Sequence, residues 1–191
     1  MTEQNAYQVA DWNGQSGEYW VANQVRLDAM MAVFGQAAIE AAAPATGERV
    51  LDVGCGAGAS SLDLAARVGA TGHVLGVDIS EPLIGRACAL APQDTPVLFQ
   101  VADASSAELL EGAFDILFSR FGVMFFDDPT AAFANMRRAL KPGGPLSFAG
   151  AAWPRTIGCA YRWARSRTSS RYPRRPVPKR PAHSRSATGS V

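Results

Sequence analysis

Three glycines and two aspartates in the first half of the chain have the types and spacing needed to hold a nucleoside. Gly54, Gly56 and Gly58 stand at every second position directly after an apolar run. Glycine tolerates positive φ and lets another molecule approach the main chain closely, so these residues predict a cofactor cradle. Asp78 follows Gly58 by 20 residues, where a carboxylate can accept hydrogen bonds from a ribose. Asp103 could accept one from an exocyclic amine such as that of adenine, and helix capping is the alternative role for both aspartates.

The glycines alone leave two classes of cofactor open. The spacing Gly54-x-Gly56-x-x-Ala59 also fits the G-x-G-x-x-G/A pattern of dinucleotide-binding folds. Asp52 lies inside the apolar run, two residues before the loop, and a buried carboxylate needs a partner. A pyrophosphate would repel it, whereas an ammonium-bearing cofactor without phosphate would attract it. Asp52 therefore favours the second class, and an NAD-binding oxidoreductase is the alternative.

No catalytic base or metal site stands out in the sequence. Of the two histidines, His73 begins an apolar segment and His183 lies in a basic C-terminal stretch. Three cysteines without a recognisable spacing predict neither a disulfide framework nor a zinc cluster. Cys55, in the glycine loop, is expected to act mainly as a small filler. We assign no catalytic residue and no metal.

The elements that would position these residues alternate between strand and helix. Continuous apolar segments predict parallel strands buried on both faces of a sheet. Strands are expected at 49–54, 73–79, 96–103, 114–121 and from Pro145 onward. Helices are expected at 60–68, 81–90, briefly around 106–111, and after the cap Asp128. This order predicts an α/β fold, a doubly wound sheet that binds ligands at the carboxyl ends of its strands.

The first 45 residues are expected to form a helical segment that covers the site. Residues 1–15 look irregular, and Ser16 can cap a helix over 17–43. Trp20 and Phe34 belong to an apolar stripe at helical spacing, and Pro44 ends the pattern. Residues 46–150 would then form the cofactor-binding domain.

Five motifs, in order, make the chain resemble the class I S-adenosylmethionine-dependent methyltransferases. They are VLDVGCGAGAS, GVDIS, VADA, FDILFSRFGVMFFDDP and ALKPGG, and the resemblance extends over about residues 5–148. The group related to ubiquinone- and menaquinone-biosynthesis methyltransferases is the most similar. The resemblance implies a Rossmann-like parallel sheet that ends in an antiparallel hairpin. It also implies S-adenosyl-L-methionine as cofactor and methyl transfer to an acceptor, which we expect to be a small molecule.

The resemblance further implies roles for individual residues. Asp52 would lie near the amino group of the cofactor and Asp78 on its ribose. Asp103 and Ala104 would lie at the adenine. The implied cofactor-binding set is Asp52, Gly54, Cys55, Gly56, Gly58, Asp78, Ile79, Asp103, Ala104 and Arg120. Tyr19, Trp20 and Phe121 are the candidate acceptor-side residues.

The charge distribution separates residues 151–191 from the rest of the chain. Residues 1–150 hold 17 acidic and 8 basic residues, whereas 151–191 hold 10 basic and no acidic ones. We expect this Arg/Pro/Ser-rich tail to be disordered. A frameshifted or truncated C-terminus, lacking the terminal hairpin, is the favoured explanation, and weak turnover would follow. A nucleic-acid-binding arm and a solvating tail are the alternatives.

Composition and the N-terminal residues indicate which compartment the protein is expected to occupy. Hydrophobic residues make up 48% of the chain, but no apolar run has the length of about 18 residues that a membrane span needs. The N-terminus lacks the basic and apolar regions of a signal peptide. We therefore expect a cytoplasmic protein with a small-molecule partner, and the sequence does not predict an oligomeric state.

Overall fold

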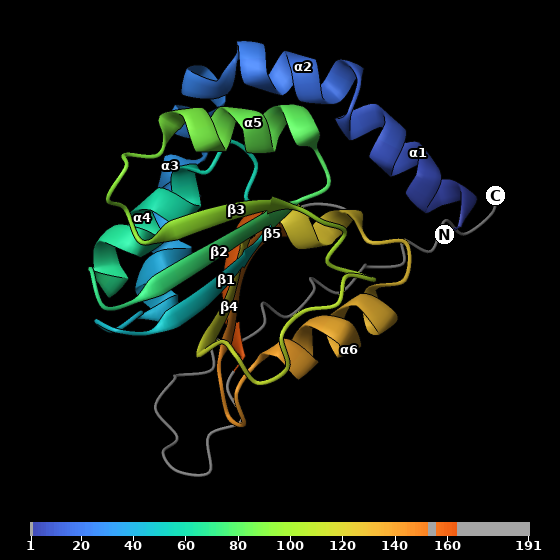
Figure 1. Cartoon of the computed structure of the whole chain (residues 1–191). Helices are drawn as coiled ribbons and strands as arrows, with labels where there is room; N and C mark the ends of the chain where they lie inside the picture. The colour runs from blue at the N-terminus through green and yellow to red at the C-terminus, as the bar shows by residue number, and fades with distance from the viewer. Residues whose placement is uncertain (1, 153–155, 164–191) are drawn as a thin grey trace, which may run out of the picture.

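The computed structural model describes residues 2–152 and 156–163. Within them the chain forms a sheet of six strands in the order β3-β2-β1-β4-β5-β6. Strands β1 to β5 run parallel, and β6 pairs with β5 in the antiparallel sense. Helices pack on both faces, so the architecture is the Rossmann-like α/β fold that the sequence predicts (Figure 1).

The first four strands agree closely with the apolar segments in the sequence. They are β1 (Arg49–Val53), β2 (His73–Asp78), β3 (Val97–Val101) and β4 (Ile116–Arg120). Strand β1 lies between β2 and β4, and four of its five residues are buried. Continuous apolar character was therefore a correct sign of burial on both faces for β1. It was wrong for β3, which lies at the edge of the sheet and leaves Leu98 and Val101 exposed.

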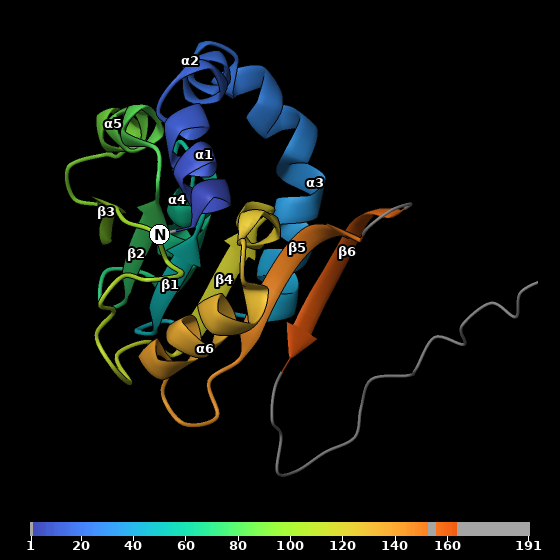
Figure 2. The same cartoon turned by 90° about the vertical axis from the view of Figure 1, so that its right-hand side faces the viewer.

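Helices from distant parts of the chain cover the two faces of the sheet. On one face lie α3 (Gln24–Ala42), α4 (Ala59–Val68) and α5 (Glu81–Leu90), and on the other lies α6 (Pro129–Ala139) (Figure 2). Asp128 caps α6 by accepting a hydrogen bond from the backbone N–H of Ala131 (2.9 Å), as the sequence predicts. No helix among the described residues is long and apolar enough to cross a bilayer.

The N-terminal segment is helical, but its predicted boundaries were wrong. Residues expected to be irregular form α1 (Glu3–Trp12), and the single helix expected over 17–43 is divided into α2 (Gln15–Ala22) and α3. Ser16 lies inside α2 and does not cap a helix; its hydroxyl donates to Asp11 (2.8 Å). A break at Asn23 separates α2 from α3, and the Asn23 side-chain amide donates to the carbonyl of Tyr19 (2.8 Å) at the end of α2. The short helical turn expected around 106–111 is absent, and that range is mostly irregular, with turns only at its two ends.

The structure also corrects the predicted end of the ordered sheet. Strand β5 (Leu146–Ala152) is followed by β6 (Thr156–Trp163), so the edge of β5 that we expected to be open is paired. The expectation rested on the average composition of the tail. Its segment 155–163 contains no proline and holds Thr, Ile, Tyr and Trp, which are common in strands. Of the antiparallel terminal hairpin that the resemblance implies, β6 is one strand. The rest of the predicted tail, 153–155 and 164–191, lies outside the described residues.

Candidate functional site

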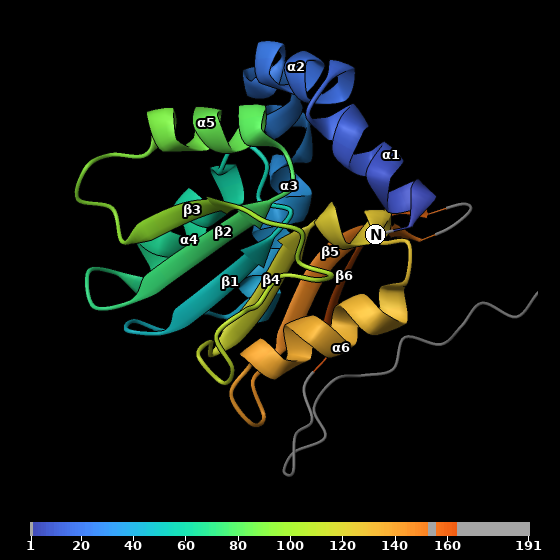
Figure 3. The same cartoon turned by 45° about the vertical axis from the view of Figure 1, so that its right-hand side comes forward.

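A cavity of about 540 Å³ lies at the carboxyl ends of β1 to β4 and is also lined by residues of the N-terminal helices. Figure 3 shows α1 and α2 on this side of the sheet. Ten of the residues predicted to form the site contribute to its wall. These are Trp20, Gly54, Cys55, Gly56, Asp78, Ile79, Asp103, Ala104, Arg120 and Phe121. Three other predicted residues, Asp52, Gly58 and Tyr19, do not line it. The fold thus gathers most of the predicted set at one edge of the sheet.

The three glycines of the loop have different surroundings, although the sequence assigned them one role. A Cβ on Gly54 would lie 2.5 Å from the Cα of Gly122, and a Cβ on Gly58 would lie 2.8 Å from the ring of Phe99. These two glycines therefore permit close packing inside the protein. A Cβ on Gly56 would meet no atom within 4 Å, and Gly56 lies in the cavity wall. At Gly56 the absence of a side chain therefore leaves the backbone open, with no packing inside the protein that requires glycine.

Asp78 ends β2 and is held firmly at the cavity wall. Its carboxylate accepts backbone hydrogen bonds from Gly56 (2.8 Å) and Ser80 (3.0 Å). Burial raises the pKa of Asp78, while these two hydrogen bonds act in the opposite direction. The hydrogen bond between Gly56 and Asp78 also holds the glycine loop next to the end of β2. A rigid acceptor beside an open backbone suits the hydroxyl groups of a ribose.

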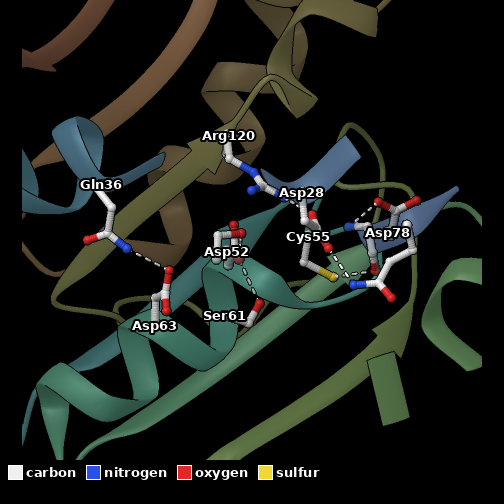
Figure 4. Close-up of polar contacts among 11 residues, drawn as sticks. Asp28, Gln36, Asp52, Cys55, Ser61, Asp63, Asp78 and Arg120 are labelled. Atoms are coloured by element: carbon white, nitrogen blue, oxygen red, sulfur yellow. Dashed lines mark hydrogen bonds and ion pairs between the residues drawn. The ribbon is translucent and has the colours of Figure 1, made fainter. Parts of the chain in front are cut away.

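Asp52 lies beneath the loop, in the middle of the sheet. It is fully buried, and its Oδ2 accepts hydrogen bonds from the hydroxyls of Ser60 (2.8 Å) and Ser61 (2.6 Å) at the start of α4 (Figure 4). Its Oδ1 has no hydrogen-bond partner. Burial raises the pKa of Asp52 to about 6 despite the two hydroxyls. Because Asp52 does not reach the cavity wall, the geometry favours a role in holding α4 against the loop.

Asp103, after β3, connects the cavity wall to the N-terminal helix. Its Oδ2 accepts a hydrogen bond from Asn5 of α1 (2.9 Å), and its Oδ1 accepts one from the backbone N–H of Ser105 (2.9 Å). Partial burial acts to raise the pKa of Asp103, but hydrogen bonds from Ser105 and Asn5 outweigh it and lower the pKa. Asp103 is thus an ionised acceptor at the β3 end of the cavity, beneath α1.

Arg120, at the end of β4, is paired with an acid from α3. Its Nη2 lies 2.9 Å from Asp28, and both side chains are mostly buried (Figure 4). Asp28 also accepts a hydrogen bond from Gln24 (2.6 Å). A second cavity of about 380 Å³ lies behind Arg120, between α3 and α4. Arg120 therefore forms part of the wall between two cavities and carries a charge that Asp28 balances.

Aromatic and methionine side chains line the cavity near the end of β4. Trp12 makes edge-to-face contacts with Trp20 and with Phe125, with ring centroids 5.6 and 5.5 Å apart. Phe34 makes a similar contact with Phe121 (5.8 Å). Such pairs hold large apolar surfaces in defined orientations. Trp20 is therefore on the wall as predicted, whereas its neighbour Tyr19 is exposed on the other side of α2.

The remaining chemically active side chains do not supply an obvious catalyst. His73 lies at the amino end of β2, away from the cavity. Cys55 is buried, and burial raises the pKa of its thiol well above the usual value, which opposes thiolate formation. Among the described residues, no cluster of side chains is suited to a metal ion.

Sequence reasoning missed several residues of the wall. They are Asn5, Gln8, Trp12, Met30, Met31, Met124, Phe125 and Phe126. Asn5 and Trp12 were missed because residues 1–15 were predicted to be irregular. The two α3 methionines belong to an apolar stripe that was interpreted as facing the core. In the structure they line the cavity.

Comparison with known proteins identifies the family of this fold. The model of the family described as a methyltransferase domain matches residues 50–144. Phosphoethanolamine N-methyltransferase 1 of Triticum aestivum is 39% identical over 108 residues, which are 52% of this chain and 20% of that protein. Aklanonic acid methyltransferase DauC of Streptomyces sp. (strain C5) is 34% identical over 116 residues, which are 60% of this chain and 53% of that protein.

A solved structure supports the same relationship. Phosphoethanolamine N-methyltransferase 2 of Haemonchus contortus, in complex with S-adenosyl-L-methionine, superimposes with a TM-score of 0.57 at 31% identity. The match covers 61% of this chain and 27% of that one. The chain therefore spans between a fifth and about half of the curated relatives described here. The matched domain, the strand order and the position of the cavity place the chain in the class I S-adenosylmethionine-dependent methyltransferase family.

Proposed function

We propose that this chain binds S-adenosyl-L-methionine in the cavity at the ends of β1 to β4 and transfers its methyl group to a small-molecule acceptor. The observation that carries the proposal is the open space at Gly56. A Cβ there would meet no protein atom within 4 Å, Gly56 lines the cavity, and its backbone N–H donates to the carboxylate of Asp78. Bare backbone beside a fixed carboxylate is what a nucleoside with an amino-acid arm requires.

The residues of the wall fit the parts of this cofactor. The loop around Gly56 would hold the methionine part, Asp78 would accept from the ribose hydroxyls, and Asp103 with Ala104 would hold the adenine. The predicted role of Asp52 is modified, since it would act on the cofactor only through the loop and α4. Nothing in the comparisons favours the NAD alternative.

The chain's own contribution to the reaction would be positioning and exclusion of water. The bound cofactor supplies a methyl group on a positively charged sulfur, which is already a good methyl donor. The aromatic residues near β4 would then hold the acceptor and keep water out, and proximity would account for much of the rate.

Calorimetry with S-adenosyl-L-methionine tests the proposal, together with transfer of a labelled methyl group to added acceptors. Saturable binding that requires Asp78 is the expected result. Binding of NADH in place of S-adenosyl-L-methionine, or binding of neither compound by the folded chain, would contradict it.

A further inference from the structure

The cavity has a polar part and an apolar part, and the order of strands separates them. Its carboxylates, Asp78 and Asp103, follow β2 and β3. Near β4, on the far side of β1, the wall is built from side chains of α2, α3 and the segment after β4. That part is lined by Trp20, Met30, Met31, Phe34, Phe121 and Phe125. If the cofactor lies along β1 to β3, these residues surround the acceptor.

The apolar part offers little charge to an acceptor. Within the described part of the chain, Arg120 is the cation that lines the cavity. Its guanidinium is already bound to Asp28 at 2.9 Å, and Gly35 packs against its alkyl chain. Phosphate sites in proteins are usually built from several cationic or N–H donors with free hydrogen-bonding capacity. A phosphorylated acceptor could therefore bind only to Arg120 among the described cations of the wall, and the charge of Arg120 is already balanced by Asp28.

The apolar part also lacks a group that could remove a proton. The cavity wall, as far as the chain is described, contains no histidine, tyrosine, lysine or glutamate. Asp78 and Asp103 are at the cofactor end, and the thiol of Cys55 is held protonated by burial. Proton removal by a side chain is a common aid when the nucleophile is a weak acid. An acceptor that ionises unaided would not need such a group.

We infer that the acceptor is a flat, apolar, ring-bearing compound whose nucleophile is an acidic hydroxyl, as in an enol or an electron-poor phenol. This inference rests on the proposed function. The hydroxyl loses its proton to water before or during binding. The resulting oxyanion then attacks the methyl carbon, forming an O–CH₃ bond while the S–CH₃ bond breaks. The electron pair of the broken bond returns to sulfur, which becomes a neutral thioether.

The inference separates this chain from the phosphoethanolamine methyltransferases that it resembles in sequence. A phosphoethanolamine acceptor carries a phosphate that needs cations and an ammonium that must lose a proton. The apolar part of the cavity provides neither a free cation nor a base among its described residues. Its aromatic rings, held edge to face against one another, instead suit a ring compound, since aromatic pairs gain from edge-to-face and offset contacts.

Two probes and a pair of neighbouring variants test the inference. The probes are 2-hydroxy-1,4-naphthoquinone, an acidic planar enol, and phosphoethanolamine. Each is titrated calorimetrically into the full chain saturated with S-adenosylhomocysteine. Trp20→Ala removes a ring from the wall, whereas Tyr19→Ala, on the same helix, removes an exposed ring that does not line the cavity. Phe125→Ala is a second wall variant in case the Trp20 variant fails to fold.

The naphthoquinone should bind, and the Trp20 and Phe125 variants should weaken it at least about tenfold, as expected for buried aromatic contacts. The Tyr19 variant should change its affinity by less than about twofold. Tighter binding of phosphoethanolamine, or equal effects of Trp20→Ala and Tyr19→Ala, would overturn the inference. If the unmodified chain bound the naphthoquinone but not S-adenosylhomocysteine, that result would contradict the proposed function and leave the inference about the acceptor standing.

Discussion

Substituting alanine for single glycines of the cofactor loop separates ligand binding from packing. Gly56 and Gly54 both have positive φ, at +56° and +68°, so alanine is strained at either position by about 1–2 kcal/mol. At Gly56 the added methyl group meets no protein atom within 4 Å. At Gly54 it would lie 2.5 Å from the Cα of Gly122, where two backbones must separate to admit it.

The two variants should therefore fail in different ways. Gly56→Ala should lower the free energy of unfolding by about 1–2 kcal/mol, the cost of the left-handed conformation alone. Its methyl group would crowd the bound cofactor, and overpacking of this kind costs about 1–3 kcal/mol, or a roughly 5- to 150-fold loss of affinity. Gly54→Ala should add a backbone displacement to the strain and lose more than about 3 kcal/mol of stability.

Chemical denaturation and calorimetry with S-adenosyl-L-methionine measure the two effects on the same samples. Gly143→Ala, also at positive φ with no neighbouring atom but far from the cavity, is the control for strain alone. It should match Gly56→Ala in stability and the wild type in affinity. Wild-type affinity in Gly56→Ala would refute the assignment of Gly56 to the ligand, and equal stability of the Gly54 and Gly56 variants would refute the packing argument.

Three further predictions follow from the buried charges. Asp52 has a pKa of about 6 in the folded chain against 3.8 in the unfolded chain, so ionisation of this carboxyl opposes folding. The free energy of unfolding should therefore fall by about 3 kcal/mol in total as the pH rises from about 4 to above 6. Denaturation across the same pH range should show that Asp52→Asn lacks this component. Asp78→Ala should weaken binding of S-adenosyl-L-methionine by about 1.5–3 kcal/mol in calorimetry, whereas Asp94→Ala, at an exposed loop position, should leave it unchanged. Asp28→Asn removes the charge that balances the mostly buried Arg120 and should cost about 3 kcal/mol in denaturation, and no loss of stability would show that the pair is dispensable.

The strands and the glycine loop were predictable because their determinants are local. Each apolar segment carries its own signal, and the carboxyl ends of β1, β2 and β4 fall within one residue of the predicted ends. The loop after β1 and the position of Asp78 follow from the order of strand and helix. Asp52 was correctly placed in a buried strand, but sequence could not show that Ser60 and Ser61 would satisfy it.

The N-terminal helices and the last strand were not predictable to the same degree. Helix α1 has no buried residue, so it lacks the apolar stripe on which a prediction depends. It is held by contacts far away in the chain, such as Asn5 with Asp103 and the Trp12 carbonyl with Ser80. Strand β6 lies in a segment whose average composition is that of a polar tail. Its pairing with β5 depends on a proline-free stretch that the average concealed.

A crystal structure of the chain grown with S-adenosylhomocysteine tests the central claim most directly. We predict electron density for the ligand along the ends of β1 to β3, with its amino-acid arm over Gly56 and its ribose hydroxyls within hydrogen-bonding distance of Asp78. The apolar part of the cavity near Trp20 should stay open for an acceptor. Ligand density in the cavity behind Arg120, or an adenosyl group placed among the aromatic residues with Asp78 uncontacted, would contradict the account.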